Sequence, residues 1–115
     1  MPSFKNMIKP LQIVSDDQRR TLYEFGHGKW KVAKYLIIKE DCKIGGHYHN
    51  NKDECFLILS GQATININHE KYTLYAPFTV DVSRGTFHEF EVKAGSQLIC
   101  LASEEHDPND DLVIN

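Results

Sequence analysis

The sequence predicts an all-β fold, either a sandwich or a closed barrel, built as a single domain. Its 115 residues suit one domain of ordinary size. Short runs rich in β-branched and aromatic residues follow one another closely, with glycine and proline between them. No stretch shows the 3.6-residue periodicity of an amphipathic helix. This combination is typical of all-β sandwiches and barrels.

Within the single domain (residues 1–115), the chain divides into an arm, a core and a tail. The N-terminal arm, residues 1–30, is the least regular part. It predicts a short strand around residues 11–14 and a glycine-containing loop at residues 26–28. The core, about residues 31–103, contains strand-like runs at residues 31–38, 54–59, 62–68, 71–75, 78–82, 88–92 and 97–102.

Two local patterns complete this outline. The run at residues 62–68 alternates between apolar and polar side chains, and a turn at His69 and Glu70 joins it to the run at residues 71–75 as a hairpin. The last segment, residues 104–115, is rich in acids, so we expect a solvated tail or an edge segment.

The composition excludes several classes of partner. The net charge is −3 and the basic residues are scattered, so we expect no nucleic-acid partner. No apolar run reaches the roughly 18 residues of a membrane span, and the N-terminus lacks a signal-peptide pattern, which predicts a cytoplasmic protein without a membrane partner. The three cysteines form no CxxC pair. Cys55 and Cys100 lie in apolar runs, as buried hydrophobic residues do.

The strongest chemical signal lies between Gly45 and Gly61, in the segment GGHYHNNKDECFLILSG. On a β-strand, His47 and His49 would face one side together, because side chains two residues apart point the same way. Glu54 follows five residues after His49. Imidazole and carboxylate groups in this pattern indicate a divalent-metal site.

A fourth ligand is expected from His88, at the start of the run HEFEV. In that run His88 shares its face with Phe90 and Val92, which makes the face apolar and inward. Glu54 shares its face with Phe56 in the same way, and a carboxylate in an apolar interior needs a cation or a hydrogen-bonding partner. The predicted metal ligands are therefore His47, His49, Glu54 and His88.

These residues resemble the two motifs of the cupin family. The first motif, G(X)5HXH(X)3–4E(X)6G, is matched by His47, His49, Glu54 and Gly61; the centre of the second is matched by Gly85 and His88. Four other motif positions differ, at Asp41, Pro77, Ser83 and Val92. The resemblance implies a double-stranded β-helix, or jelly-roll barrel, that holds one divalent transition metal ion: iron, manganese, nickel, zinc or copper.

A weaker resemblance connects the chain to the nucleotide-sugar 3,4-ketoisomerases. It is carried by the segments KVAKYLII, GGHYHNNKDE and LICLASEEHDPND. It implies that His47, His49 and Tyr35 transfer protons, as catalytic residues. The family's arginine before the histidine pair is missing, and Glu54 stands where that family has a carboxamide; both departures favour a metal site.

Three functions fit this site. The first is an isomerase or epimerase that acts on a sugar or similar carbonyl metabolite, in which the metal polarises a carbonyl group. The second is an iron-dependent dioxygenase of a small polar substrate. The third is a non-catalytic module that binds a small molecule. All three predict a small-molecule ligand, and the first is favoured modestly over the second.

Other residues carry subsidiary predictions. Phe56, Phe90 and Gln97 could line the pocket with Tyr35 or pack in the core. Arg84 either holds an anionic substrate group or decorates a turn, and the turn is favoured. The three remaining histidines are expected in loops or in the solvated tail, at His27, His69 and His106.

The parity of the run ECFLILS also predicts the assembly. Cys55, Leu57 and Leu59 point away from Glu54 and form an apolar strip on the outer face. Either the N-terminal arm or a second subunit must cover this strip, which predicts a homodimer.

Overall fold

The computed structural model describes residues 4–113, and these residues form an all-β fold. The outer ends of the arm and the tail, residues 1–3 and 114–115, lie outside the described residues. The strands are β1 (Ile8–Lys9), β2 (Gln12–Asp16), β3 (Thr21–Glu24), β4 (Val32–Ile37), β5 (Cys42–His47), β6 (Glu54–Ser60), β7 (Gln62–Ile67), β8 (Glu70–Tyr75), β9 (Phe78–Val82), β10 (His88–Val92) and β11 (Gln97–Ala102). Two short 3-10 helices, η1 (Phe4–Met7) and η2 (Pro108–Asp110), stand at the ends. Within residues 4–113, no helix has the length and apolarity needed to span a membrane.

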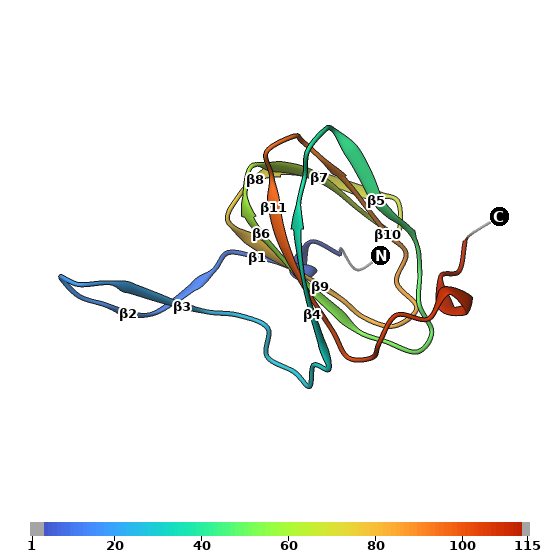
Figure 1. Cartoon of the computed structure of the whole chain (residues 1–115), viewed down its shortest axis with the longest axis horizontal. Coiled ribbons are helices and arrows are strands. Elements are labelled where there is room, and N and C mark those ends of the chain that lie inside the picture. Colours follow the sequence, from blue (N-terminus) through green and yellow to red (C-terminus); the bar gives the residue numbers. More distant parts are fainter. Residues whose placement is uncertain (1–3, 114–115) are drawn as a thin grey trace.

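Two antiparallel sheets enclose the core (Figure 1). The larger sheet has the order β1-β9-β6-β11-β4 and the smaller one β5-β10-β7-β8. The strand pairing interleaves segments far apart in the sequence, as expected for a jelly roll. A separate hairpin, β2 with β3, extends away from the barrel. The predicted all-β barrel is therefore confirmed.

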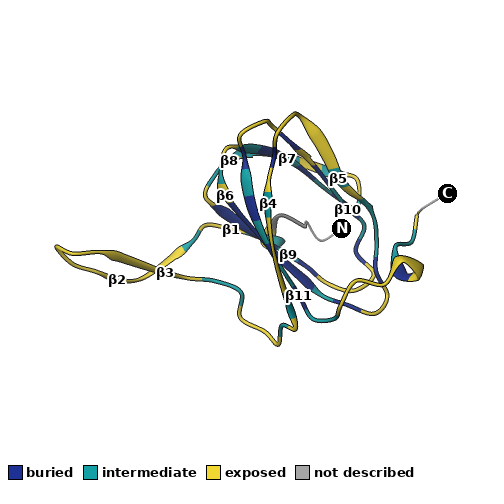
Figure 2. Cartoon of the chain, in the orientation of Figure 1, coloured by how far each residue is buried: buried dark blue, intermediate teal, exposed yellow. Residues whose placement is uncertain are grey.

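The core consists of the inward faces of both sheets (Figure 2). Phe90 and Val92 are fully buried on β10, whereas Glu91 between them is exposed. Likewise, Ala63, Ile65 and the other inward residues of β7 alternate with partly exposed ones. The burial of alternate side chains therefore confirms the inward face predicted for His88.

Three strands were missing from the sequence interpretation: β1, β3 and β5. The strands β1 and β3 are short and carry partly or fully exposed side chains, so no apolar alternation marks them. The strand β5 contains Gly45 and Gly46, and glycine is depleted in strands, so the local sequence does not mark it as one. The turn of the β7–β8 hairpin lies at Asn68 and His69, one residue earlier than predicted, and both residues have a positive φ.

Close packing explains the glycine at position 45. Gly45 has a φ of +86°, and a Cβ atom there would lie 2.7 Å from the carbonyl oxygen of His88. The pairing of β5 with β10 also contains an irregularity between His88 and Glu89. A glycine therefore lets β5 approach the start of β10, where His88 is positioned.

The chain itself covers most of the apolar strip on β6. Cys55 and Leu57 are buried, whereas Leu59 remains 43% exposed. Residues of the arm lie over the outer face of this sheet, since a Cβ atom on Gly26 would be 2.6 Å from Cδ1 of Leu101. Of the two predicted covers, the arm is the one seen in the single chain.

Candidate functional site

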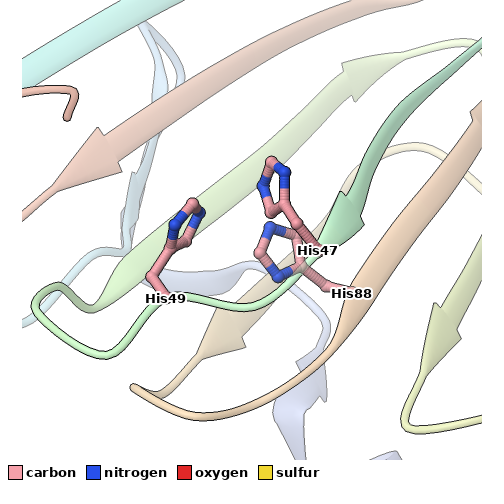
Figure 3. A group of neighbouring side chains, drawn as sticks. All are labelled: His47, His49 and His88. Carbon is pink, nitrogen blue, oxygen red and sulfur yellow. The ribbon is translucent and has the colours of Figure 1, made fainter. Parts of the chain in front are cut away.

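Three histidines meet inside the barrel (Figure 3). His47 is the last residue of β5 and His88 is the first residue of β10, and the two are partners in the register of these strands. His49 follows β5, where the neighbouring Tyr48 pairs with Leu112. One ring nitrogen from each histidine lies within 4.8 Å of those of the other two. Because β5 ends at His47, His49 lies outside the strand, and the two histidines do not share a strand face as their spacing suggested.

Glu54, the first residue of β6, faces this cluster. Its Oε1 atom lies 3.1 Å from Nε2 of His49 and 3.4 Å from Nε2 of His88. The other carboxylate oxygen, Oε2, accepts a hydrogen bond from the thiol of Cys100 at 3.4 Å. The structure therefore brings the three predicted histidine ligands together and places Glu54 beside two of them, His49 and His88.

Hydrogen bonds at the outer nitrogens fix the orientation of two rings. Nδ1 of His49 lies 2.9 Å from the carbonyl oxygen of Asp110, and Nδ1 of His88 lies 3.2 Å from that of Thr86. A carbonyl oxygen only accepts, so each Nδ1 must carry the hydrogen. In the neutral rings both Nε2 atoms then present lone pairs toward Glu54.

Burial favours the neutral form of His47 and His88. Burial lowers the pKa of His88 from 6.5 to about 4, and the nearby carboxylate of Glu54 offsets only part of this effect. Burial, followed by repulsion from His49, also lowers the pKa of His47. Neutral imidazole is the form that binds a metal ion.

The buried oxygen of Glu54 provides a test of whether a metal ion fits. Oε1 has no hydrogen-bond partner among residues 4–113, although the Glu54 side chain is only 8% exposed. A carboxylate oxygen facing two imidazole lone pairs is an unfavourable arrangement without a cation between them. Ligand atoms about 2.0–2.2 Å from one ion lie roughly 3 Å apart when they are adjacent. The donor types fit a divalent transition metal, and the distances from Glu54 to His49 and His88 are close to this spacing.

A cavity of about 180 Å³ opens beside the cluster. Its lining combines the four candidate ligands with basic, acidic and apolar residues: Lys34, Leu36, Ile44, Gly45, Lys52, Phe56, Cys100, His106 and Asp111. Phe56 lines the cavity, as one of its two predicted roles required, whereas the fully buried Phe90 packs in the core. The cavity offers room for a small ligand next to the histidines.

Tyr35 does not belong to this cavity, so its predicted position at the site is wrong. It is 58% exposed, and its hydroxyl donates a hydrogen bond to Oε1 of Gln97 at 2.6 Å. In the pairing of β4 with β11, its neighbour Lys34 is opposite the buried Cys100. Since side chains alternate along a strand, Lys34 faces inward and Tyr35 faces outward. Gln97 is therefore also outside the pocket.

The C-terminal segment is exposed at residues 105–109, and its end pairs with Tyr48 through Leu112, in agreement with the predicted solvated tail or edge segment. Asp110 is buried, and its carboxylate accepts hydrogen bonds from the backbone of Asn50 and Asn51 at 3.0 and 3.1 Å. Asp111 places Oδ1 at 3.4 Å from Nδ1 of His49. The segment thus returns to the loop that carries His49 and supports it.

The same segment contributes His106, whose side chain is 47% exposed, as predicted for this segment. His106 lines the cavity, and its Nε2 lies 3.6 Å from Oδ2 of Asp111. The other two histidines agree with their predicted positions: His27 and His69 are exposed and lie away from the cluster. Arg84 is bound to Asp53 through both its backbone N–H and its side chain, which supports the predicted turn.

No protein-family model and no curated protein matches the chain. Among solved structures, it is similar to a TDP-quinovose 3,4-ketoisomerase from Campylobacter jejuni (TM-score 0.79, 23% identity, covering 93% of this chain and 91% of that one). A 3,4-ketoisomerase from Helicobacter canadensis gives a TM-score of 0.75 at 20% identity, covering 90% and 86%. The capsular polysaccharide assembling protein CapF from Staphylococcus aureus gives a TM-score of 0.59 at 28% identity over 91% of this chain; the chain spans 35% of that protein. The fold of this protein is therefore the cupin-like jelly-roll barrel that the sugar 3,4-ketoisomerases share.

Proposed function

We propose that this protein is a divalent-metal-binding isomerase or epimerase that acts on the carbonyl group of a sugar. The observation that carries the metal site is the unpartnered Oε1 atom of Glu54, buried 3.1 and 3.4 Å from Nε2 of His49 and His88. A divalent ion held by His47, His49, Glu54 and His88 would supply Lewis-acid polarisation of a carbonyl.

The chain's own residues would supply the remaining chemistry. Isomerisation of a keto sugar moves a proton between neighbouring carbons, so a base must face the cavity. His106 with the carboxylate of Asp111 fits this role, since both line the cavity and Asp111 can stabilise a protonated imidazole. Tyr35, whose hydroxyl is bound to Gln97 on the outer face, does not fit it. The proposal thus transfers the proton-moving role to His106.

Two observations support a sugar as the substrate. Two of the structural neighbours are 3,4-ketoisomerases, and one of these acts on a TDP-linked sugar. The cavity of about 180 Å³ is smaller than the roughly 300–1,000 Å³ typical of drug-sized ligands, so it suits a single sugar ring. The proposed substrate class is a keto sugar, linked to a nucleotide in the manner of the neighbour's substrate.

We also propose that the protein is a homodimer. Large apolar side chains remain exposed on the projecting β2–β3 hairpin and on β4: Ile13, Val14, Leu22, Tyr23, Tyr35 and Ile37. Exposed apolar side chains on a projecting hairpin and on an edge strand favour burial against a second subunit. Sedimentation at micromolar concentration tests this assignment, and a monomer would contradict it.

The function is tested on protein purified without an affinity tag. Metal analysis is expected to give about one transition-metal ion per chain, and a TDP-linked 4-keto sugar is then incubated with and without oxygen while its NMR spectrum is recorded. An isomerase converts the sugar in both atmospheres and exchanges a carbon-bound hydrogen with solvent deuterium. Oxygen uptake that matches substrate loss would identify a dioxygenase instead. Binding without conversion of any keto sugar would identify a binding module.

A further inference from the structure

Lys52 has a largely buried side chain that forms no ion pair with residues 4–113. The residue is only 5% exposed, and its side chain lines the cavity beside the histidines. Among residues 4–113, no carboxylate oxygen lies within the 4.0 Å ion-pair distance of its Nζ atom, and the side chain forms no hydrogen bond. Its Nζ atom is not one of the fully buried side-chain atoms without a partner among residues 4–113, so the buried part is the stem and the ammonium group reaches open space beside the cavity, where it can bind an anionic group.

The acidic groups nearby are already engaged. Glu104 is paired with Lys31 at 2.7 Å. Asp110 accepts two backbone hydrogen bonds, from Asn50 and Asn51. Because Asn50 and Asn51 directly precede Lys52, these bonds also fix the loop that carries it. The Asp110 carboxylate attracts Lys52 through space without contacting it, so the ammonium group keeps its hydrogen-bond donors for a ligand.

Lys52 also lies at a junction between two cavities. The cavity of about 180 Å³ beside the histidines and a neighbouring one of about 710 Å³ share Lys52 and His106 in their linings. A ligand with a ring in the smaller cavity would pass Lys52 where it enters the larger one. A charged oxygen attached directly to the ring would then meet the ammonium group.

We propose that Lys52 is the anion-binding residue of this site and that it selects ligands carrying a negatively charged oxygen next to the sugar ring. The chemistry is that of a phosphoryl or carboxylate oxygen, which a lysine binds as a point charge. The identity of the ring rests on the proposed function, but the anion requirement does not. A nucleotide-linked sugar presents such a phosphoryl group, and a sugar acid presents a carboxylate.

The test measures binding to the metal-free protein, so that a bound ion contributes nothing. Glucose 1-phosphate, glucuronate and neutral glucose are titrated against the protein while the histidine C–H signals are followed by NMR. The two anionic sugars are expected to bind at least about 10-fold more tightly than glucose. The stronger of the two identifies the phosphoryl or the carboxylate oxygen as the natural group.

Variants separate Lys52 from general electrostatics. In Lys52→Met the preference for anionic sugars over glucose is expected to disappear, and in Lys52→Arg it is expected to persist. Lys31→Met is the matched control, because it removes the same charge from the larger cavity but from a lysine already paired with Glu104. Lys52→Gln is measured in parallel, so that a folding defect of the methionine variant does not decide the outcome.

Three results would overturn the proposal. These are no preference for anionic sugars in the natural protein, a preference that survives in both Lys52→Met and Lys52→Gln, or an equal loss in Lys31→Met. The assay needs no turnover, so a failure to isomerise keto sugars would reject the proposed function while leaving this result intact. Conversely, isomerase activity with an unchanged Lys52→Met variant would reject only the role of Lys52.

Discussion

The backbone carbonyl oxygen of Asp110 lies 2.9 Å from Nδ1 of His49, across 61 residues of sequence. This contact sets the tautomer of the imidazole that directs Nε2 to Glu54. The Asp110 carboxylate meanwhile binds the backbone of the next two residues, Asn50 and Asn51. The C-terminal segment is therefore part of the candidate metal site.

Replacing Asp110 by alanine is expected to weaken metal binding by roughly 10–100-fold, because partners of this kind orient the ligands of a metal. The loss of two buried hydrogen bonds is expected to lower the free energy of unfolding by about 1–3 kcal/mol. Metal titration followed by calorimetry measures the first effect and denaturant unfolding the second. Glu105→Ala, which removes an acid of the same segment at an exposed position, serves as the control. Equal metal affinity in both variants would show that the segment does not support His49.

Glu54→Gln is expected to separate metal binding from folding. The amide is a poor metal ligand, so the metal content of the purified protein should fall to about a tenth or less. The metal-free variant should be as stable as the natural metal-free protein or more stable, because the uncharged amide replaces a buried carboxylate whose Oε1 has no hydrogen-bond partner among residues 4–113. Elemental analysis and thermal unfolding give the two measurements. Glu89→Gln, at a more exposed position on β10, should change neither. A metal-free Glu54→Gln protein that unfolds at a lower temperature would argue for a structural carboxylate.

Gly45→Ala tests the close approach of β5 to His88. A methyl group at this position would lie 2.7 Å from the His88 carbonyl oxygen, so we expect a loss of stability and a displaced His88 with weaker metal binding. Gly95→Ala is a well-matched control: Gly95 has a similar φ of +88°, but a Cβ atom there has no neighbour within 4 Å. Both variants share the cost of a left-handed backbone, roughly 1–2 kcal/mol. The excess loss in Gly45→Ala, expected at about 1–3 kcal/mol, measures the steric conflict. Equal losses of stability in the two variants would mean that β5 shifts away from His88 without a steric cost.

The stability of the metal-free protein should depend on the ionisation of His88. Its pKa falls from 6.5 to about 4 on burial, so between these values the unfolded chain binds a proton that the folded chain does not. The free energy of unfolding is therefore unaffected by His88 above pH 6.5, and it decreases as the pH falls from 6.5 toward 4. The total effect is on the order of 3 kcal/mol. Denaturant unfolding from pH 7 to 4 should show this decline, which His88→Gln should reduce and the exposed-site variant His69→Gln should leave intact. If the free energy of unfolding changed with pH equally in all three proteins, groups other than His88 would be responsible.

Tyr35→Phe should leave catalysis nearly unchanged, since the hydroxyl is bound to Gln97 on the outer face. We expect turnover of a keto sugar within about twofold of the natural protein and a loss of stability of about 1 kcal/mol from the missing hydrogen bond. His106→Gln should instead slow turnover by roughly 10²–10⁴-fold, as expected for a general acid–base group. A large decrease in Tyr35→Phe, with none in His106→Gln, would return the proton-transfer role to the tyrosine.

The sequence by itself determined the features that depend on local spacing. Alternation along a strand has a period of two, so burial on one face could be assigned within HEFEV and within ECFLILS without knowledge of any partner strand. This is why the inward positions of His88 and Glu54 were predicted correctly. The resemblance to the cupin motifs predicted that these two strands and the histidine pair meet at one site. It also predicted the jelly-roll barrel.

Other features depended on pairing across long sequence distances. The strand KVAKYLI has no clear apolar alternation, so only its register with β11, which sets Lys34 opposite Cys100, decided that Tyr35 faces outward. The acidity of the C-terminal segment indicated a solvated tail or an edge segment, but not the burial of Asp110, which backbone donors and His49 compensate. A local pattern does not record such compensation, because the partners of a buried polar group come from whichever segments the fold brings to it.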